Sequence, residues 1–535
     1  MEINKINTYL GHKGYTILKN ELTIEQQIQI RNDLTIKPFL IGSLNNQKQF
    51  PAYRESNKKF YLPYYYGFDK FGLPKKYKIN NGHNIHVEFN GKLREGQIPV
   101  VETYINHVKD LQYGGGLLEL PCAFGKTCLA LNIISRLEKK TFIIVHKEFL
   151  MNQWIERIQQ FLPTARIGKI QGQIIDIDNK DIVIGMLQSI SMKEYPENIF
   201  QSFGLTIIDE VHHISSEVFS NSLFKLVTKY MLGLSATMNR KDGTTNVFKM
   251  FIGDVIFKGK RDEERNVEIR AIQYAVNDEE FNEVKLDYRG NAAYSSMISK
   301  LCEYNRRSEF ILKILSDMLI ENENQQIMIL AHNKNILKYL HDAIQHRNIA
   351  SVGYYIGGMK ESALKETEGK KIVIATYSMA AEALDIKTLT TLIMATPKTD
   401  IEQSVGRILR EKHSQPIVVD IIDSHDIFQN QWRKRKTFYK KENYKIISTT
   451  NSLYTSNSNE WKTIYEPIQN KNKNKNKTEC KNIAKNKKNN SVKSNSSSDK
   501  SIANDSDDED ELNEINENQK KDKYACGVCL LQMKK

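Results

Sequence analysis

A Gly-Lys-Thr tripeptide follows an apolar run near residue 120, and its residue types could bind a phosphate group. The stretch from Leu118 to Thr127 reads Leu-Glu-Leu-Pro-Cys-Ala-Phe-Gly-Lys-Thr, and residues 128–137 then have a helical pattern. A strand, a tight loop and a helix in this order aim backbone N–H groups and a helix N-terminus at one point, which suits a polyphosphate. Lys126 would reach the terminal phosphates, and the Thr127 hydroxyl would hold Mg²⁺. Leu120 stands where the first glycine of the usual loop falls, so the tripeptide alone does not establish a nucleotide site.

Two adjacent carboxylates follow a second apolar run, residues 205–208. In open α/β sheets ligands bind beyond the carboxyl ends of the strands, so Asp209 and Glu210 can converge with Lys126 on one magnesium nucleotide. Asp209 would anchor Mg²⁺, while Glu210 would orient and deprotonate the attacking water. An Asp-Glu pair is common on protein surfaces, but the apolar run before it and His212-His213 after it favour the catalytic interpretation.

Two further motifs come later in the chain. Ser235-Ala236-Thr237 follows another apolar run, where small hydroxyl residues can connect the carboxylate pair to the substrate side. On a helix expected over residues 400–409, Gln403, Arg407 and Arg410 stand at i, i+4 and i+7, so one face carries an amide and two guanidinium groups. An arginine held against the terminal phosphate by a second lobe is an arginine finger. The alternative is an amphipathic helix with solvated basic residues.

Short apolar runs alternate with helical patterns twice along the chain, which is typical of parallel sheets covered by helices. The first series begins at Leu117 and predicts strands at residues 141–145, 166–171, 181–185, 205–208 and 230–234. The second series predicts strands at residues 327–331, 351–355, 371–375, 389–395 and 417–422. We therefore expect an α/β protein with two parallel-sheet lobes, residues 91–258 and 259–448, in which residues 259–300 are weakly patterned and link the lobes.

The two ends of the chain differ from this core. Residues 1–90 are rich in tyrosine and lysine, so they could stack bases and contact phosphates, but a small α+β accessory domain with a tyrosine-rich core is the favoured interpretation. Residues 449–535 contain a Lys/Asn tract, a serine-rich run and an acidic block, a composition that predicts a disordered tail. Cys526 and Cys529 form a lone C-x-x-C in this tail, without the second pair that a zinc site needs.

Composition narrows the class of protein. The chain has 77 Lys and Arg against 64 Asp and Glu, a formal charge of +13 that favours a polyanionic partner. Six irregularly spaced cysteines indicate a reducing compartment rather than a disulfide framework. The chain shows neither the apolar core of a signal peptide nor a run of ~18 apolar residues. We expect a soluble, intracellular protein that binds no membrane.

Six motifs occur in a fixed order along residues 90–445, and this order carries a family resemblance. They are Arg94…Gln97, Pro121-Cys122-Ala123-Phe124-Gly125-Lys126-Thr127, Asp209-Glu210-Val211-His212, Ser235-Ala236-Thr237, Glu382…Asp385 and Gln403…Arg407…Arg410. The set resembles superfamily 2 DExH-box helicases, most of all the xeroderma pigmentosum group B type, the translocase of the TFIIH complex. Leu120-Pro121-Cys122 and Arg240-Lys241-Asp242-Gly243 are similar to that branch, which has relatives in large DNA viruses.

The resemblance implies two RecA-like lobes with ATP and Mg²⁺ between them, so that the active site is split between the lobes. The residues it places around ATP are Arg94, Gln97, Pro121, Cys122, Ala123, Phe124, Gly125, Lys126, Thr127, Asp209 and Asp385, with Arg94 and Gln97 near the adenine. Thr127 and Asp209 would ligate Mg²⁺, and the catalytic set would be Lys126, Glu210, Gln403, Arg407 and Arg410. Ala123, Phe124 and Ala383 depart from the family's frequent residues.

Three functions are compatible with these motifs. The first is an ATP-dependent helicase or translocase acting on DNA, in viral transcription or repair, with the transcription machinery as a partner. The second is the same motor on RNA, and the third is a non-hydrolysing nucleic-acid clamp or transcription-complex scaffold. A motor is favoured over a scaffold by five intact residues: Lys126, Asp209, Glu210, Arg407 and Arg410. A viral protein of this kind would act in the host cytoplasm or the virion.

Overall fold

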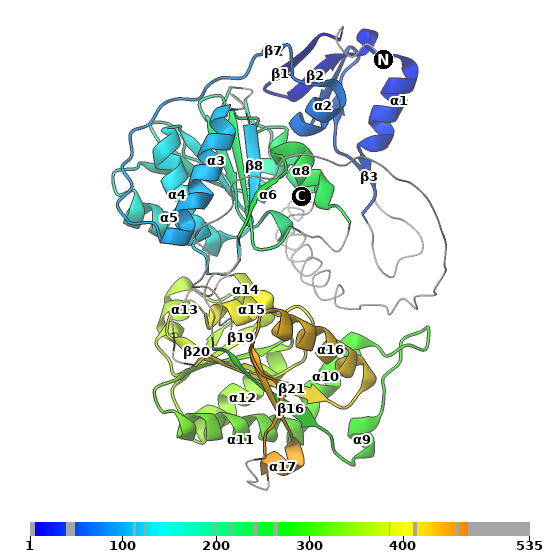
Figure 1. Cartoon of the computed structure of the whole chain (residues 1–535), viewed down its shortest axis with the longest axis vertical. Coiled ribbons are helices and arrows are strands. Elements are labelled where there is room, and N and C mark those ends of the chain that lie inside the picture. Colours follow the sequence, from blue (N-terminus) through cyan, green and yellow to red (C-terminus); the bar gives the residue numbers. More distant parts are fainter. Residues whose placement is uncertain are drawn as a thin grey trace, which may run out of the picture. The chain divides into compact units, whose positions relative to one another are not determined.

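The computed structural model (Figure 1) describes residues 6–38, 49–110, 114–121, 123–196, 198–213, 216–238, 243–259, 266–382, 384, 386–409, 413, 415–455 and 460–468. The chain divides into two compact units, and the boundary between them falls at Arg265 apart from short segments between residues 360 and 387. Of the tail predicted over residues 449–535, the part from residue 469 onward lies outside the described residues, and it includes Cys526 and Cys529. Among the described helices, none has the length and apolar character that crossing a bilayer requires.

The first unit begins with a small sheet that carries two helices. Its strand order is β5-β6-β2-β1-β7. The strands are β1 (Thr8–Gly11), β2 (Gly14–Leu18), β5 (Arg54–Glu55), β6 (Lys59–Leu62) and β7 (Lys76–Tyr77), with β3 (Thr35–Ile36) and β4 (Phe50–Pro51) pairing separately. The helices are α1 (Ile24–Asp33) and α2 (Tyr64–Phe71). Thr23 caps α1 because its hydroxyl accepts from the Gln26 N–H at 3.2 Å while the Gln26 side chain accepts from the Thr23 N–H at 2.9 Å.

The main sheet of the first unit is parallel apart from one edge strand, in the order β11-β10-β12-β9-β13-β14-β8-β15. Its strands are β8 (Gly114–Glu119), β9 (Thr141–Val145), β10 (Ile167–Gln171), β11 (Ile174–Ile175), β12 (Ile182–Met186), β13 (Leu205–Ile208), β14 (Tyr230–Ser235) and β15 (Val255–Lys258). Its helices are α3 (Ile98–Asp110), α4 (Lys126–Leu137), α5 (Glu148–Phe161), α6 (Leu187–Met192), α7 (Ser216–Leu223) and α8 (Thr245–Ile252).

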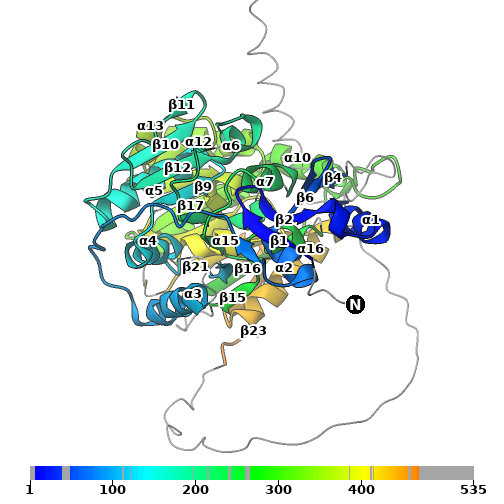
Figure 2. The same ribbon diagram turned by 90° about the horizontal axis from the view of Figure 1, so that it is seen from above.

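Helices cover both faces of this sheet, which explains why its strands are continuously apolar. Leu118 and Ile143 pack with the buried residues of α3, α4 and α5. Their chain neighbours Leu117 and Phe142 pack with α6, α7 and α8 on the opposite face. Because successive strand residues alternate between faces, each run fills two cores at once. Figure 2 shows the same elements from above.

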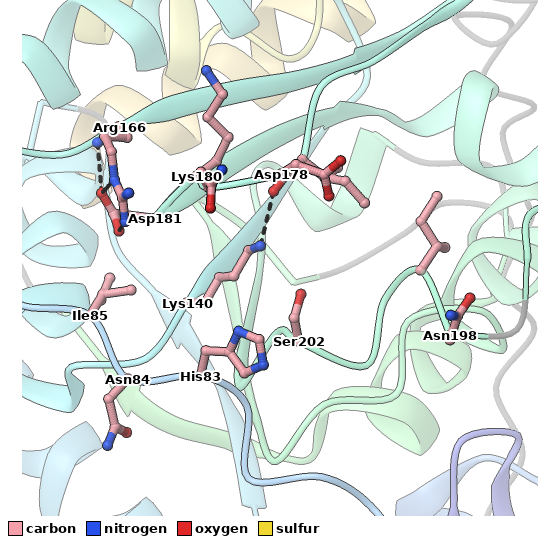
Figure 3. Close-up of a pocket in the computed structure, with 13 residues that line it drawn as sticks. His83, Asn84, Ile85, Lys140, Arg166, Asp178, Lys180, Asp181, Asn198 and Ser202 are labelled. Atoms are coloured by element: carbon pink, nitrogen blue, oxygen red, sulfur yellow. Dashed lines mark hydrogen bonds and ion pairs between the residues drawn. The ribbon is translucent and has the colours of Figure 1, made fainter.

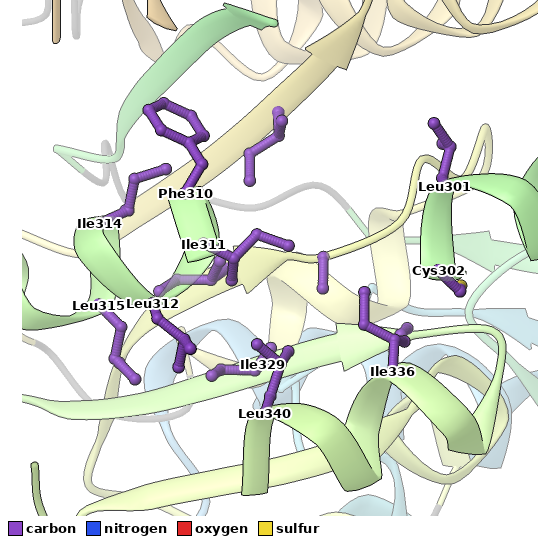
Figure 4. Close-up of a cluster of buried hydrophobic side chains, with 14 of the residues drawn as sticks. Leu301, Cys302, Phe310, Ile311, Leu312, Ile314, Leu315, Ile329, Ile336 and Leu340 are labelled. Carbon is purple, nitrogen blue, oxygen red and sulfur yellow. The ribbon is translucent and has the colours of Figure 1, made fainter. Parts of the chain in front are cut away.

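The second unit has its own sheet, in the order β18-β19-β17-β20-β21-β16-β22-β23. Its strands are β16 (Glu268–Tyr274), β17 (Gln326–Ala331), β18 (Val352–Tyr355), β19 (Ile372–Thr376), β20 (Leu389–Met394), β21 (Ile417–Asp423), β22 (Lys445–Thr450) and β23 (Lys462–Tyr465). Its helices are α9 (Glu279–Asn282), α10 (Tyr294–Glu303), α11 (Asn305–Glu321), α12 (Lys334–His346), α13 (Glu361–Glu368), α14 (Tyr377–Glu382), α15 (Glu402–Arg407), α16 (Asp426–Lys441) and α17 (Asn451–Thr455). Figure 4 shows the cluster where α11 and α12 pack on β17.

The structure corrects three sequence predictions. Residues 259–300 are more than a link, because β16 pairs with both β21 and β22 inside the second sheet. The sheet also continues past residue 448, since β22 reaches Thr450 and pairs with β23. The strands β16, β22 and β23 mix polar and apolar residues, so no apolar run marks them in the sequence. Backbone pairing with neighbouring strands fixes their positions in the sheet. The helix predicted over residues 400–409 is shorter in the structure, where α15 begins at Glu402 and ends at Arg407. Arg410 lies outside the described residues.

Candidate functional site

The phosphate-loop, carboxylate and Ser-Ala-Thr motifs of the first unit come together at one edge of its sheet. β14 lies between β8 and β13 and is parallel to both. The carboxyl ends of the three strands therefore lie together. β8 leads into the loop before Lys126, β13 leads to Asp209 and Glu210, and Ser235 is the last residue of β14. The Leu120 N–H donates to the Ser235 carbonyl at 2.8 Å, which joins the loop directly to the end of β14.

Lys126 and Glu210 form an ion pair at this edge. The ammonium group donates to Oε1 of Glu210, and the two side chains are only 13% and 20% exposed. Lys126 is the first residue of α4, so its side chain lies beside the N–H groups at the start of that helix. The partial positive charge of a helix start and the ammonium group together favour an anion there.

The loop before Lys126 contains two residues with positive φ angles, Ala123 and Gly125. Gly125 has a φ of 89°, and a Cβ there would lie 2.5 Å from Nε2 of Gln97 and 3.0 Å from Nη2 of Arg94. Ala123 also has a positive φ, 64°. The glycine at position 125 is therefore required both by its left-handed conformation and by the space that the two side chains occupy.

Arg94 and Gln97 hold this loop through its carbonyl groups. Arg94 Nη2 donates to the carbonyls of Ala123 at 3.2 Å and Phe124 at 2.5 Å, and Gln97 Nε2 donates to Phe124 at 2.7 Å. Because a trans peptide points its N–H opposite to its carbonyl, these bonds turn the Gly125 N–H away from Arg94 and Gln97. Their predicted contact with adenine stays a prediction.

Asp209 is a buried carboxylate with a fixed orientation. Its Oδ2 accepts from the indole N–H of Trp154 at 2.9 Å, and its Oδ1 accepts from the Glu210 N–H at 3.0 Å. Burial, together with the neighbouring Glu210 carboxylate, raises the pKa of Asp209, while Lys126 acts in the opposite direction. A divalent cation would favour the ionised form in the same way, so the donor set of Asp209 and the Thr127 hydroxyl is chemically suited to Mg²⁺.

His212 connects the carboxylate pair to the Ser-Ala-Thr motif. Its Nδ1 lies 2.5 Å from the Ser235 hydroxyl and 3.5 Å from Oε2 of Glu210. The Ser235 hydroxyl in turn donates to the Thr237 carbonyl. The sequence motifs pointed to His212 and Ser235 separately, and the structure brings them into contact.

The sequence prediction missed Trp154. It is a buried residue of α5, the helix that follows β9, and β9 is the direct neighbour of β13. A lone tryptophan on such a helix is expected to serve the core, and its spacing from Asp209 gives no separate signal.

In the second unit, the loop that leads from β20 to α15 is held at four successive carbonyls. Each accepts a hydrogen bond from a different side chain: Arg307 to Ala395 at 2.6 Å, Tyr377 to Thr396 at 2.5 Å, Tyr294 to Pro397 at 3.0 Å and Arg435 to Lys398 at 3.0 Å. The two arginines are themselves fixed by fully buried ion pairs, Arg307 with Asp423 and Arg435 with Asp420. This loop sets where α15 begins, and α15 carries Gln403 and Arg407.

Several predicted site residues are not positioned by the structure. Cys122, Asp385 and Arg410 lie outside the described residues, as do Arg240, Lys241 and Asp242. Pro121 and Thr127 are described, the first in the loop and the second in the first turn of α4.

A cavity of about 760 Å³ lies at the amino ends of β9, β10 and β12 in the first unit's main sheet (Figure 3). Its lining includes Lys140, Arg166 and Asp181, which directly precede β9, β10 and β12. Lys140 donates to the Ile177 carbonyl at 2.9 Å, and Arg166 pairs with Asp181 at 2.7 Å. Among the residues that the structure describes, none of the motif residues lines this cavity.

Comparisons with known proteins find two family models that match this chain. Residues 90–240 match the family model described as type III restriction enzyme, res subunit, and residues 310–412 match the helicase conserved C-terminal domain. Each match falls within one of the two parallel-sheet lobes. The fold and the motifs thus define a two-lobed helicase core.

Three similar proteins come from viruses. The chain is 34% identical over 459 residues to a protein of Acanthamoeba polyphaga mimivirus that carries the name ATP-dependent RNA helicase L396, and the match covers 83% of this chain and 87% of the relative. It is 27% identical over 381 residues to ATP-dependent RNA helicase QP509L of African swine fever virus, covering 66% and 74%. It is 25% identical over 420 residues to helicase 161L of Invertebrate iridescent virus 6, covering 73% and 91%.

The chain belongs to the superfamily 2 helicases, with homologues among viral helicases. Membership implies an enzyme that hydrolyses ATP, typically with Mg²⁺, and that binds nucleic acid. The two parallel-sheet lobes predicted from the sequence are confirmed.

Proposed function

We propose that this chain is a DExH-type motor, related to the xeroderma pigmentosum group B branch, that couples ATP hydrolysis to movement on DNA. The observation that carries the proposal is the meeting of Lys126, Asp209 and Glu210 at one sheet edge. A cation, a carboxylate suited to Mg²⁺ and a second carboxylate are the groups that hydrolysis of a terminal phosphate needs.

Each residue has a role in this proposal. Lys126 and the start of α4 bind the terminal phosphates, with Gly125 allowing their close approach and Arg94 and Gln97 fixing the loop. Thr127 and Asp209 hold Mg²⁺. Glu210 is the general base for the attacking water, and Nδ1 of His212 lies 3.5 Å from its Oε2. Arg407 and Arg410 supply guanidinium groups that neutralise charge on the transferred phosphoryl group, and the Gln403 amide donates hydrogen bonds to it. Pro121 to Phe124 shape the loop, and Asp385 contacts the nucleotide.

RNA is the second candidate track, because the mimivirus and African swine fever virus relatives carry the name RNA helicase. A motor that grips its strand mainly through phosphates does not distinguish the two by affinity alone. The test is phosphate release by the full chain in the presence of single-stranded DNA, duplex DNA or single-stranded RNA at matched nucleotide concentration and salt. Stimulation by DNA of at least tenfold over RNA supports the proposal, and the reverse order assigns the chain to RNA.

Lys126→Ala is the control for that assay. We expect it to abolish phosphate release with every track while far-UV circular dichroism stays that of the wild type. Wild-type turnover in a folded Lys126→Ala variant would place the ATP site elsewhere.

A further inference from the structure

The outer face of the N-terminal sheet gathers two tyrosines and several lysines. The register puts Tyr9 of β1 and Tyr61 of β6 both opposite Thr16 of β2, so the two rings lie on the same face on either side of the middle strand. Lys76 of β7 pairs with Tyr9 and continues the row. We call this row, with Lys13, Lys59 and Lys78, the tyrosine–lysine face.

The ammonium groups on this face surround the two rings. Lys59 Nζ donates to the Tyr9 hydroxyl at 3.1 Å, and Lys78 Nζ lies 4.4 Å from the centre of the Tyr9 ring. Lys13 Nζ lies 6.0 Å from the centre of the Tyr61 ring. The lysines at positions 13, 76 and 78 are exposed, and both tyrosines are half-buried. Aromatic planes with cations around them are the pattern that binds a single-stranded polyanion through bases and phosphates.

The opposite face of the same sheet forms the core of this part of the chain. Tyr15 and Leu62, each one residue along from Thr16 and Tyr61, are fully buried and pack with residues of α1 and α2 such as Ile30 and Tyr66. Since the core is on that side, the fold itself does not need Tyr9 and Tyr61 as aromatic residues. A surface row of aromatics is therefore available for a ligand.

The spacing of the two strands that carry Tyr9 and Tyr61 suits two bases with one nucleotide between them. Tyr9 and Tyr61 stand on strands separated by β2, which is two strand spacings or ~10 Å. A single strand crossing the sheet at right angles to β1, β2 and β6 could stack one base on each ring, with one nucleotide between the two stacked bases. Lysine stems are flexible enough to leave the rings and follow the phosphates.

This sheet is fixed to the motor lobe by specific hydrogen bonds. The Tyr65 hydroxyl of α2 donates to the Gly115 carbonyl at 2.9 Å and accepts from the Gly115 N–H at 2.6 Å, at the start of β8. Arg54 of β5 donates to the Asn221 carbonyl at 3.3 Å and lies over the Phe224 ring. A strand held on the tyrosine–lysine face would therefore be attached to the sheet that carries Lys126.

We propose that the tyrosine–lysine face is a second binding site for single-stranded nucleic acid, with Tyr9 and Tyr61 stacking bases and Lys13, Lys59, Lys76 and Lys78 binding phosphates. The site needs neither ATP nor the second lobe, so it goes beyond the proposed motor. It anchors the strand to the first lobe during every stage of the nucleotide cycle.

The test uses the full chain without nucleotide and a fluorescein-labelled 20-nucleotide single strand, titrated at several salt concentrations. Tyr9→Leu with Tyr61→Leu should weaken binding about 30-fold or more, the effect expected for two lost stacking contacts, with an unchanged salt dependence. Tyr9→Phe with Tyr61→Phe keeps both rings and should bind as the wild type does. Equal binding by the Leu and wild-type proteins, or equal loss in the Leu and Phe variants, overturns the stacking roles.

The lysines are tested by variants that leave the fold alone, since Lys76 and Lys78 are exposed. Lys76→Gln with Lys78→Gln should reduce the slope of log affinity against log salt by about 1.4, or 0.7 for each lost phosphate contact. Lys109→Gln with Lys180→Gln removes the same charge elsewhere on the first unit and should leave the slope unchanged. An unchanged slope in the Lys76/Lys78 variant, or an equal change in the control, overturns the site. Phosphate release is not measured here, so failure of the proposed motor does not affect the result.

Discussion

The indole N–H of Trp154 donates to Oδ2 of Asp209 at 2.9 Å, so an aromatic residue of α5 orients a carboxylate that follows β13. Both residues are buried, and a buried oxygen without a hydrogen-bond donor costs free energy. The indole N–H supplies a donor for Oδ2 of Asp209. Under our proposal Asp209 would hold Mg²⁺, and the bond from Trp154 limits the rotation of its carboxylate. Residues behind a metal ligand commonly change metal affinity by about 10- to 100-fold.

Trp154→Phe is therefore expected to raise the Mg²⁺ concentration needed for half-maximal ATP hydrolysis by roughly tenfold. The phenyl ring keeps most of the packing and removes only the N–H donor. A Mg²⁺ titration of phosphate release measures the effect. Trp432→Phe, a change in α16 of the second unit, is the control and should not shift the titration. An unshifted titration for Trp154→Phe would mean that the hydrogen bond serves only the fold.

Glu210→Gln should keep Mg-ATP binding and stop turnover. The amide preserves the size of the side chain but cannot accept a proton, and loss of a general base costs about 10²- to 10⁴-fold. Binding of a fluorescent ATP analogue and phosphate release are measured on the same sample, with Glu217→Gln on α7 as the matched control. If the variant loses binding as severely as hydrolysis, Glu210 acts through its ion pair with Lys126 rather than as the base.

Arg407→Ala should bind ATP and turn over at least about 10³-fold more slowly, the effect of a lost arginine finger. The measurement is turnover as a function of nucleic-acid concentration. Arg433→Ala on α16 removes an exposed guanidinium group and should leave turnover near the wild-type value. Full rescue of Arg407→Ala at saturating nucleic acid would make Arg407 a strand-binding residue instead.

Arg435→Leu should destabilise the second unit by about 3–5 kcal/mol, because it leaves the fully buried Asp420 carboxylate without its partner and the Lys398 carbonyl without its donor. Arg347→Leu removes an ion pair with Glu309 in the same unit, but there the side chains are 45% and 43% exposed and the cost should be below about 1 kcal/mol. Denaturant unfolding of both variants gives the comparison. Similar free energies of unfolding would show that the buried pair adds nothing beyond an exposed one.

Acid should destabilise the second unit through His332. Burial, with nearby Lys398, lowers the pKa of His332 to about 3, while an unfolded histidine titrates near 6.5. The folded state keeps this ring neutral, whereas the unfolded chain protonates it below about pH 6.5. The free energy of unfolding is therefore highest above about pH 6.5 and decreases as the pH falls toward 3. The midpoint of urea unfolding should fall less between pH 7.5 and pH 5 in His332→Asn than in the wild type. Equal falls in the two proteins would exclude His332 as a source of the acid sensitivity.

Local sequence determined much of the fold. The apolar runs at residues 141–145 and 205–208 are strands because they fill a core on each face of a sheet. The start of α1 is also local, because its capping box involves only Thr23 and Gln26. The order of the motifs also placed Lys126 and Asp209 after strands, and parallel strands that end at one edge bring such residues together.

Tertiary structure decided what depends on pairing between distant segments. β16 and β22 lie side by side through backbone hydrogen bonds, although more than 170 residues separate them and neither is a purely apolar run. The bond from Trp154 to Asp209 and the four side chains on the carbonyls of residues 395–398 arise because packing brings distant residues together. A sequence pattern reports periods within one element, whereas a contact across elements is fixed by how the cores pack. The residues that could carry the chemistry were readable from the chain, and the residues that hold them in place became visible only in the fold.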